Sequence, residues 1–439
     1  MASRLSKVLD MMFASNLASH VRDGYAFLMQ NYTVGDKICM FGFSRGAYTA
    51  RALAGMLYKV GLLPAGNIQQ IPFAYDMYQR EDEAMSKEFK QASCRSVHID
   101  FLGVWDTVAS VGLVPHHLPY VHENRAVRYL RHALALDERR VKFIPQFCTD
   151  PPSDTAVNNA KEQERNNNAE KRAYTSPMSD VEEVWFTGVH CDVGGGAVIN
   201  EKTVKLSGIP LRWMIRECFK CNTRIVFDAA VLRKLGLPVY VSGETGNPIL
   251  APLYEVTSLP YPSPSQETPT PQDNLEILPA DYELRRDLDD AHDDLHDMLK
   301  GSPMWNILEW LPLHLKKEKA LASGAEGRDS YRWVWNRGKG RKIVKREIQE
   351  GWKVHRTVLL RLHADKDYVP QACPNIPIAK NPKTNRDKTR EADVGRATKS
   401  LKDPRRLDHD EWRGLEWIIP QDGSAWTLVN PHKTKKVSS

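Results

Sequence analysis

The chain has 439 residues, of which 41% are hydrophobic, so it can bury a sizeable core as one large domain with insertions or as two domains. No apolar run approaches the length of a membrane span, which needs about 18 residues. The first residues also lack the apolar core and cleavage pattern of a signal peptide. The net charge is +6, and residues 380–406 alone carry ten basic and four acidic side chains, the same surplus. The remainder is nearly neutral, which argues against a nucleic-acid-binding core and predicts no specific nucleic-acid partner.

The seven cysteines favour a reducing compartment, because their number is odd and several stand in apolar, strand-like surroundings. We therefore expect a cytoplasmic protein, with peripheral contact to membranes left open. Cys218 and Cys221 form a lone CxxC pair with no second pair and no nearby histidines, so packing is favoured over a zinc site. We expect no metal and no cofactor, and the sequence does not decide the oligomeric state.

The stretch DKICMFGFSRGAYTARALAGMLYKVG, residues 36–61, joins a strand pattern to a helical one. Its continuous apolar run over residues 38–41 is typical of a strand buried on both faces, and later Ala and Leu residues repeat at the helical period. Upstream, residues 5–31 predict helix around a break near Asn16. The junction itself, FGFSRG, fits a nucleophile elbow centred on Ser44.

In such an elbow Ser44 has a strained backbone, and small residues two before and two after it avoid clashes with the neighbouring strand and helix. Gly42 and Gly46 stand at those offsets. The helix start favours the negative charge that develops in acyl transfer, and the backbone N–H of Arg45 is a candidate oxyanion donor. The alternative is a serine that only caps the helix.

A candidate acid follows the next strand pattern. Residues 97–105 predict a buried strand that ends at Asp106. A carboxylate there lies on the same rim of a parallel sheet as Ser44, as the third member of a triad must. The alternative is that Asp106 caps the following turn.

A candidate base follows a later strand pattern over residues 184–189. His190 comes directly after it, and the order Ser, Asp, His is that of the hydrolases, so His190 is the predicted general base. Asp192 competes for the role of acid, and His355 is the second-choice base. Gly194 and Gly195, in a triple-glycine loop, let the backbone approach the rim closely and are candidate site-loop or oxyanion residues.

The stretch FGFSRGAYTARALAGML resembles the α/β-hydrolase-like family that includes phospholipase effectors of the bacterial type VI secretion system and many uncharacterised fungal proteins. Three later stretches resemble that family's motifs in the same order: FLGVWDTV at 101–108, WFTGVHCDVGGG at 185–196 and IPLRWMIREC at 209–218. The resemblance implies an α/β fold with a mostly parallel sheet and flanking helices. It also implies a Ser-His-Asp hydrolase that needs no cofactor and acts on a small-molecule or lipid ester, above all a phospholipid.

The N-terminus departs from the family pattern, because residues 1–35 read as helical and leave no room for the strands that normally precede the elbow. Nothing there matches the Asp-Gly-Thr loop that in the family looks like part of the oxyanion site. We therefore expect an N-terminally truncated chain with one open edge of its sheet and without a second oxyanion donor, which costs about 100- to 1000-fold in rate. The alternative function is a catalytically impaired hydrolase relative that serves as a binding or scaffold protein.

Composition predicts four parts: a catalytic domain over 1–257 with a polar insertion at 150–181, a Pro/Ser-rich linker at 258–274, a helical Trp-rich extension over 275–370 that forms a lid or completes the hydrolase domain, and a basic, largely disordered tail over 371–439. Trp305 and Trp310 precede two lysines within MWNILEWLPLHLKK. Such a stretch lines an acyl pocket, touches a membrane interface or packs in the core. WKVHRTVLLRL predicts a strand or a helix, and the late DEWRGLEWIIP is a candidate for docking back on the domain.

Overall fold

The computed structural model describes the larger part of the chain. The described residues are 2–80, 82–108, 118–121, 126–148, 179–241, 248–251, 282–301, 305, 309, 313–316, 331–334, 338–343, 352–374, 406–413, 415–418 and 426–434. The predicted linker at 258–274 lies outside them, as does the predicted insertion at 150–181 except for its last residues, which already enter a strand.

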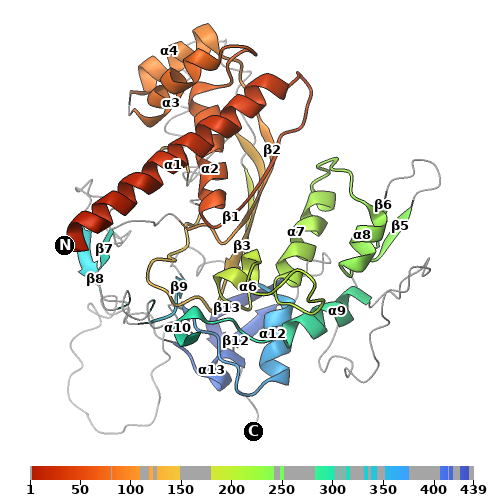
Figure 1. Cartoon of the computed structure of the whole chain (residues 1–439). Coiled ribbons are helices and arrows are strands. Elements are labelled where there is room, and N and C mark those ends of the chain that lie inside the picture. The colour runs from red at the N-terminus through yellow and green to blue at the C-terminus, as the bar shows by residue number, and fades with distance from the viewer. Residues whose placement is uncertain are drawn as a thin grey trace, which may run out of the picture.

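A seven-stranded sheet forms the centre of the molecule, in the order β1-β2-β3-β4-β10-β13-β12 (Figure 1). The first five strands run parallel, and the last two continue the sheet in antiparallel fashion. Their bounds are Cys39–Phe43, Ile99–Trp105, Val127–Ala135, Asp180–Phe186, Trp352–His355, Trp426–Thr434 and Leu415–Ile418. The α/β fold with a mostly parallel sheet is therefore confirmed.

Helices lie on both sides of this sheet (Figure 1). On one side, α2 (Arg45–Val60) packs against β1 and against α1 (Ala2–Asn31), with α3 (Ile71–Gln79) and α4 (Glu83–Ser93) outside them. On the other side, α7 (Gly208–Lys220) packs on β3, and α9 (Tyr282–Ala291) lies between α7 and α12 (Arg356–Ala364). The first helix runs without interruption, so the break predicted near Asn16 is wrong.

The remaining elements are short. They are η1 (Ile68–Gln70), α6 (His190–Gly194), α8 (Ala229–Lys234), β5 (Val239–Val241), β6 (Pro248–Leu250), α10 (Met298–Gly301), β7 (Leu313–Lys316), β8 (Tyr331–Val334), β9 (Lys342–Ile343), β11 (Cys373–Pro374) and α13 (His409–Arg413). Only α6 and the segment that contains β9 contribute to the site described below.

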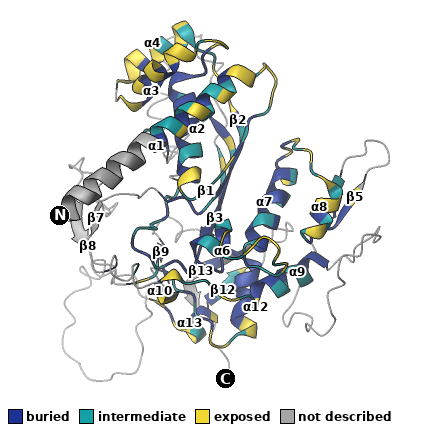
Figure 2. Ribbon diagram, in the orientation of Figure 1, coloured by how far each residue is buried: buried dark blue, intermediate teal, exposed yellow. Residues whose placement is uncertain are grey.

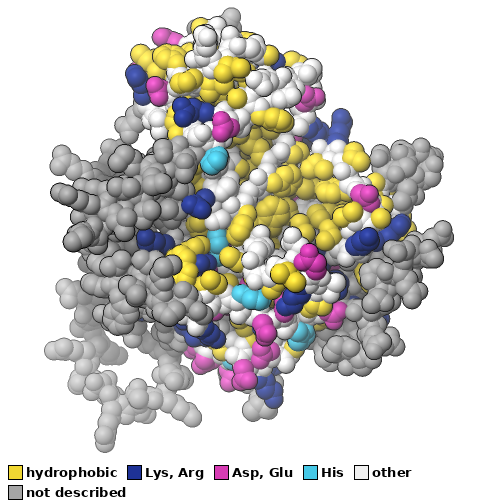
Figure 3. Space-filling view, in the orientation of Figure 1, with side chains coloured by type: hydrophobic (Ala, Val, Ile, Leu, Met, Phe, Trp, Pro, Cys, Tyr) yellow, Lys and Arg dark blue, Asp and Glu magenta, His cyan; other side chains and the backbone are white. Residues whose placement is uncertain are grey.

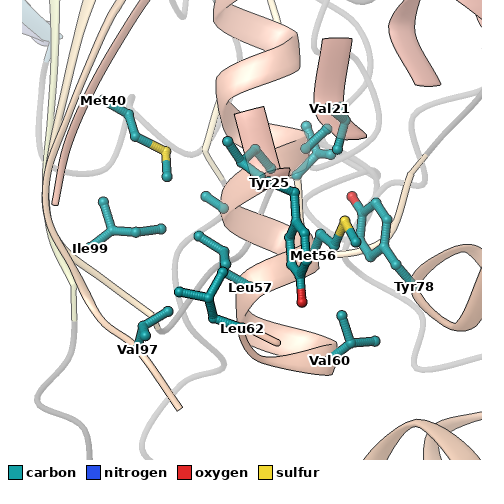
Figure 4. Packing of buried hydrophobic residues seen from close by; sticks show 14 of the residues in the cluster. Val21, Tyr25, Met40, Met56, Leu57, Val60, Leu62, Tyr78, Val97 and Ile99 are labelled. Atoms are coloured by element: carbon teal, nitrogen blue, oxygen red, sulfur yellow. The ribbon is translucent and has the colours of Figure 1, made fainter. Parts of the chain in front are cut away.

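Apolar side chains fill the layer between the sheet and the first two helices. Tyr25, Met40 and Leu57 meet there, and Figure 4 shows them pointing toward one another from α1, β1 and α2. The buried Tyr25 hydroxyl donates to the carbonyl of Gly61 (2.9 Å) and accepts from the N–H of Leu63 (2.9 Å). Because this polar group is satisfied, the apolar layer that fixes α2 behind the elbow carries no hydrogen-bonding penalty at Tyr25.

The C-terminal part of the chain completes the central sheet. β10 pairs with β4, and β13 and β12 follow at the far edge. Trp412, Leu415 and Val429 are fully buried there, and Figure 2 shows mostly buried residues throughout the central strands. The prediction of a largely disordered tail over 371–439 does not hold for these elements, because the average charge of the tail hides the apolar residues within β12 and β13.

The opposite edge of the sheet is formed by β1, which pairs with β2 on one side and with no other described strand. Phe41 of β1 is 43% exposed, and apolar side chains gather in this part of the face shown in Figure 3. The open edge that the sequence predicts is thus confirmed for the described residues. Within the same residues, no helix has the length and apolarity needed to cross a bilayer.

Candidate active site

Ser44 lies at a sharp turn between β1 and α2. Its backbone angles are φ 59° and ψ −122°, a left-handed conformation that is strained for a non-glycine residue. The Ser44 N–H donates to the carbonyl of Trp105 (3.0 Å), and its carbonyl accepts from the N–H of Tyr48 (3.3 Å). The strand pairing and the first helical turn therefore hold the strained residue from both sides, as a nucleophile elbow requires.

The two glycines of the elbow differ in what they permit. A Cβ added at Gly42 would lie 2.5 Å from the carbonyl oxygen of Gly46 and 2.7 Å from the backbone of Ala47. A Cβ at Gly46 would meet nothing within 4 Å. The predicted need for a small residue is therefore correct before the serine and wrong after it, because the structure leaves open space beside Gly46.

The structure brings the three predicted triad residues together. The Ser44 Oγ lies 2.7 Å from Nε2 of His190, and Nδ1 of His190 lies 2.6 Å from Oδ2 of Asp106. Asp106 follows β2 directly and His190 begins α6 just beyond β4, so all three side chains come from the carboxyl ends of parallel strands. In a Ser-His-Asp site the imidazole takes the serine proton and the carboxylate fixes its tautomer, and these distances allow both.

Asp106 is fully buried and its carboxylate is surrounded by donors. Oδ1 accepts from the N–H of Ala135 (2.9 Å) and from Nη1 of Arg341 (2.5 Å), and Oδ2 accepts from Nη2 of Arg341 (2.7 Å). Burial by itself raises the pKa of Asp106, but the charge of Arg341 and the hydrogen bonds from Arg341 and His190 outweigh it and hold the pKa well below its usual range. Asp106 is therefore ionised in the folded protein.

Arg341 is a site residue that sequence reasoning missed. It stands 235 positions after Asp106 in a segment that is basic throughout, where no spacing or periodicity distinguishes one arginine from its neighbours. The signal that could have found it is electrostatic: a carboxylate buried at a strand end needs a cationic partner.

Aromatic rings hold the imidazole in place. The His190 ring contacts the rings of Phe43 (centroids 4.6 Å apart) and Phe143 (4.7 Å apart). A Cβ at Gly194 would lie 1.9 Å from the Phe43 ring, so this position admits only glycine unless Phe43 moves. The backbone N–H of His190 donates to Oε2 of Glu138 (3.2 Å). Gly194 is thus a packing residue of the site loop.

Gly195, the other glycine candidate, has a different role. Its N–H donates to the carbonyl of Cys191 (2.9 Å), and its φ of 92° ends α6 in the left-handed region. That hydrogen bond makes Gly195 a helix-terminating residue, which argues against its candidate role as an oxyanion donor. Arg45, the first residue of α2, keeps its predicted place beside the nucleophile.

Asp192, the competing acid, is placed differently from Asp106. Its Oδ2 accepts from the N–H groups of Val189 (3.0 Å) and His296 (3.2 Å), and its Oδ1 lies 2.8 Å from Nδ1 of His296. Both ring nitrogens of His190 are already bonded, to Asp106 and Ser44. Asp192 therefore fixes the start of α6 and the segment that carries His296.

His355, the second-choice base, lies away from the nucleophile. It caps α12 through contacts with Thr357 (Nδ1 to Oγ1, 2.9 Å) and stacks on Phe186 with centroids 4.9 Å apart. Burial, together with the nearby Arg356 and Arg212 charges, lowers its pKa to about 3. The structure thus gives His355 a capping role, and the imidazole beside Ser44 is that of His190.

A second buried carboxylate, that of Asp137, fixes the loop that leads to His190. Asp137 accepts from the N–H of Gly188 (2.8 Å), the hydroxyl of Tyr368 (3.0 Å) and the N–H of Gln371 (3.0 Å). Burial raises its pKa to about 6 despite these three donors. Asp137 thus joins the loop before His190 to the segment that follows α12.

Trp305 lies beside the site through one intervening ring. Its ring is 5.6 Å from that of Phe143, and the guanidinium of Arg140 lies 3.5 Å from the Phe143 ring centroid and 4.9 Å from that of Trp305. Arg140 in turn forms an ion pair with Glu138 (2.8 Å). Trp310, the second predicted lipid-contact residue, lies outside the described residues.

The described part of the chain shows neither a reactive Cys218–Cys221 pair nor a metal site. Burial raises the pKa of the Cys218 thiol, and that of Cys221 rises to about 11 with burial as the first cause. Thiols with raised pKa values are poor ligands and poor nucleophiles. Among the described residues, no group of three or more His, Cys, Asp and Glu side chains is arranged to hold a metal ion.

The fold and the site together define an α/β-hydrolase-like domain with a serine at a nucleophile elbow, faced by a histidine and a buried aspartate. Residues 1–217 match the family described as "T6SS, Phospholipase effector Tle1-like, catalytic domain". The resemblance seen in the sequence motifs is thereby confirmed. The match contains Ser44, Asp106 and His190 and ends before Arg341.

Relatives share only part of their length with this chain. The uncharacterized protein YEL023C of Saccharomyces cerevisiae is 40% identical over 163 residues, which cover 34% of this chain and 24% of the yeast protein. An uncharacterized protein from Pseudomonas aeruginosa of known crystal structure is 22% identical, with a TM-score of 0.25 over 45% of this chain and 26% of its own. The Tle1 effector, solved bound to the VgrG spike of the type VI secretion system, is 18% identical, with a TM-score of 0.21 over 44% and 31%. The chain thus spans about a quarter of the length of the yeast protein and of the Pseudomonas aeruginosa protein.

Proposed function

We propose that the protein is a serine hydrolase that cleaves acyl esters of lipids or phospholipids by Ser-His-Asp catalysis. The observation that carries the proposal is the continuous hydrogen-bonded chain from Ser44 through His190 to Asp106, with distances of 2.7 and 2.6 Å. The phospholipase description of the matched family supports the lipid ester as substrate. The reaction needs no cofactor.

In this mechanism the Ser44 hydroxyl attacks the ester carbonyl while His190 accepts its proton. The oxyanion that forms lies at the N-terminus of α2, where the backbone N–H of Arg45 and the helix dipole stabilise negative charge. His190 then protonates the leaving alcohol, which leaves the acyl group bound to Ser44. A water molecule attacks this acyl group while His190 accepts its proton, and His190 returns the proton to Ser44 as the fatty acid leaves. The Phe43, Phe143 and Trp305 rings form an apolar wall beside the imidazole that suits an acyl chain.

The alternative is a catalytically impaired relative that acts as a binding or scaffold protein. It is favoured by one observation, the position of the nucleophile strand at the open edge of the sheet. In that case the elbow persists as a structural turn, and the substrate or partner binds without being cleaved.

The test compares wild-type protein with Ser44→Ala and His190→Ala, using His98→Ala as the matched control because His98 is exposed. The readouts are covalent labelling by a fluorophosphonate and fatty-acid release from phosphatidylcholine vesicles. We expect both to be abolished by the first two substitutions and unchanged in the control, since loss of the nucleophile or base costs about a million-fold in a triad enzyme. A folded wild-type protein without labelling or turnover would favour the binding function instead.

A further inference from the structure

The environment of Asp106 assigns a role to a residue from the second half of the chain. We infer that Arg341 is a positioning residue, which acts on His190 by clamping Asp106 on one side and the Phe143 backbone on the other. This inference rests on the proposed function, because it explains how the catalytic imidazole is held. It places part of the working site outside residues 1–217, the segment that matches the family.

The guanidinium of Arg341 is fully used. Nη1 donates to Oδ1 of Asp106 (2.5 Å) and to the carbonyl of Ala135 (3.0 Å), and Nη2 donates to Oδ2 of Asp106 (2.7 Å) and the carbonyl of Phe143 (2.7 Å). Nε donates to the Phe143 carbonyl as well (3.1 Å). The five N–H donors of the guanidinium thus meet five acceptor contacts. Lysine has no planar fork and cannot reproduce this pattern.

The paired contact fixes the plane of the Asp106 carboxylate. A single hydrogen bond from Ala135 leaves the carboxylate free to rotate, whereas two parallel bonds from one guanidinium hold both oxygens. The backbone of Asp106 has a φ of 43°, a strained value that persists only where surrounding contacts determine it. Arg341 therefore keeps Oδ2 aimed at Nδ1 of His190.

The second contact acts on the aromatic wall. Phe143 packs edge-on against the imidazole of His190, with centroids 4.7 Å apart, and its carbonyl is bound twice by Arg341. One side chain thus sets both the hydrogen-bond partner of the imidazole and the ring that limits its movement. Because the hydrogen bonds of Arg341 go to Asp106, Ala135 and Phe143 and none goes to Ser44, its effect on the reaction is indirect.

The backbone around Arg341 lies close against the segment that contains Gln371 and Cys373. The Arg341 carbonyl accepts from the N–H of Cys373 (2.7 Å), where β9 pairs with β11. A Cβ at Gly340 would lie 1.6 Å from the carbonyl oxygen of Gln371, so the chain can pass here only as glycine. The side chain of Arg341 is 4% exposed and reaches Asp106 from this fixed backbone.

The experiment measures the pH profile of kcat/KM, together with kcat, KM and thermal unfolding, for Arg341→Met and Arg341→Lys. The matched control is Arg361→Met, which removes another buried arginine of the same half of the chain, bound to the carbonyls of Ala291 and Asp293. In Arg341→Met we expect kcat to fall about 10- to 100-fold with KM little changed, the scale of lost charge-assisted hydrogen bonds. The acid limb of kcat/KM should also move to higher pH, because Asp106 loses the charge that keeps it ionised.

Arg341→Lys keeps the charge and loses the fork, so its acid limb should stay near that of wild type while kcat falls. Arg361→Met should lower the unfolding temperature and leave kcat and the acid limb unchanged. If Arg341→Met lowers only the unfolding temperature, as the control does, the positioning role is overturned. If Arg341→Met does not fold, a folded Arg341→Lys with wild-type kcat overturns it equally.

The proposed function is tested separately, by the turnover of Ser44→Ala. Retained turnover in Ser44→Ala would refute Ser-His-Asp catalysis whatever Arg341 does. Turnover that depends on Ser44 and is indifferent to Arg341 would refute only the role of Arg341.

Discussion

The three residues of the proposed triad are held in place by different means. Ser44 follows β1, an edge strand with one described neighbour, and its place is set by local backbone geometry. Asp106 and His190 follow β2 and β4, which have neighbours on both sides, and their side chains are almost completely buried. Their places are set by contacts with residues far away in the sequence.

The difference shows which part of the proposed site is determined by residues that are close together in the sequence. The elbow needs one strained residue, one glycine and a helix start, all within a few positions of one another. The acid–base side needs charged partners that the folded chain delivers from a distance of 235 positions, as with Arg341 and Asp106. We therefore expect the acid–base side to respond most strongly to changes in charge, and the elbow to changes in backbone shape.

Removing the charge of the acid should have the largest effect. In Asp106→Asn one amide nitrogen replaces an oxygen that binds either His190 or Arg341, so the imidazole loses its tautomer control. We expect kcat to fall about 10,000-fold, as for the equivalent change in a serine protease triad. The free energy of unfolding should fall by about 3–5 kcal/mol, because a buried arginine loses its partner.

The measurement is single-turnover kinetics together with urea unfolding, with Asp192→Asn as the matched control. Asp192 is also buried and also faces a histidine, but that histidine is His296, whereas His190 binds Asp106. A loss of activity in the control as large as in Asp106→Asn would show that the acid has been assigned to the wrong carboxylate.

The pKa of Asp137, which holds the loop before His190, can be tested through the pH dependence of stability. Burial raises its pKa to about 6 in the folded protein, whereas an aspartate of the unfolded chain titrates at about 4. Between these values the unfolded state loses its proton first, so the contribution of Asp137 to the free energy of unfolding falls as pH rises from about 4 to about 6. Above pH 6 it stays level. The fall should be roughly 3 kcal/mol, at 1.36 kcal/mol per pKa unit.

Urea unfolding of wild type and Asp137→Asn between pH 4 and 7 checks this. The difference in unfolding free energy, wild type minus variant, removes the titrations that both proteins share. A difference that stays flat or rises with pH across this window would contradict the raised pKa.

The sequence predicted those parts of the fold and site that depend on local pattern. The apolar runs of β1 and β2 and the helical periods of α2 and α7 stand at the predicted places. The strand predicted over residues 184–189 is β4, which begins earlier, at Asp180, and ends at Phe186. Ser44, Asp106 and His190 could be proposed because each directly follows a strand pattern, and a parallel sheet brings such positions to one rim.

The parts that escaped prediction depend on long-range compensation of charge. β3 was not predicted, because Arg128, Arg131 and His132 interrupt its apolar pattern; in the structure Arg131 is buried against Glu217 (2.5 Å) and Asp180 (3.2 Å). Arg341 was not predicted either, because it stands among other basic residues and its partner Asp106 is far away in the sequence. The strands β12 and β13 were hidden by the charge of the segment around them. A sequence alone does not show which charges will find partners.

The smallest predicted effects separate the two glycines of the elbow. In Gly42→Ala the new methyl group would lie 2.5 Å from the Gly46 carbonyl oxygen and 2.7 Å from Ala47 backbone atoms, none of which can rotate away. The start of α2 must shift, and we expect a loss of about 1–3 kcal/mol in unfolding free energy, typical of overpacking. Because the shift also moves Ser44, fluorophosphonate labelling should slow.

Gly46→Ala is the matched control, since its methyl group meets nothing within 4 Å. Gly46 is the second residue of α2, so alanine should stabilise the helix by up to about 1 kcal/mol through helix propensity. Thermal unfolding and labelling rate, measured on both variants, give the comparison. Equal stability losses in the two would mean that the elbow is crowded on both sides of Ser44, against the geometry described here. A stabilised Gly46→Ala beside a destabilised Gly42→Ala would show that Ser44 is held from the strand side, where β1 meets the helix.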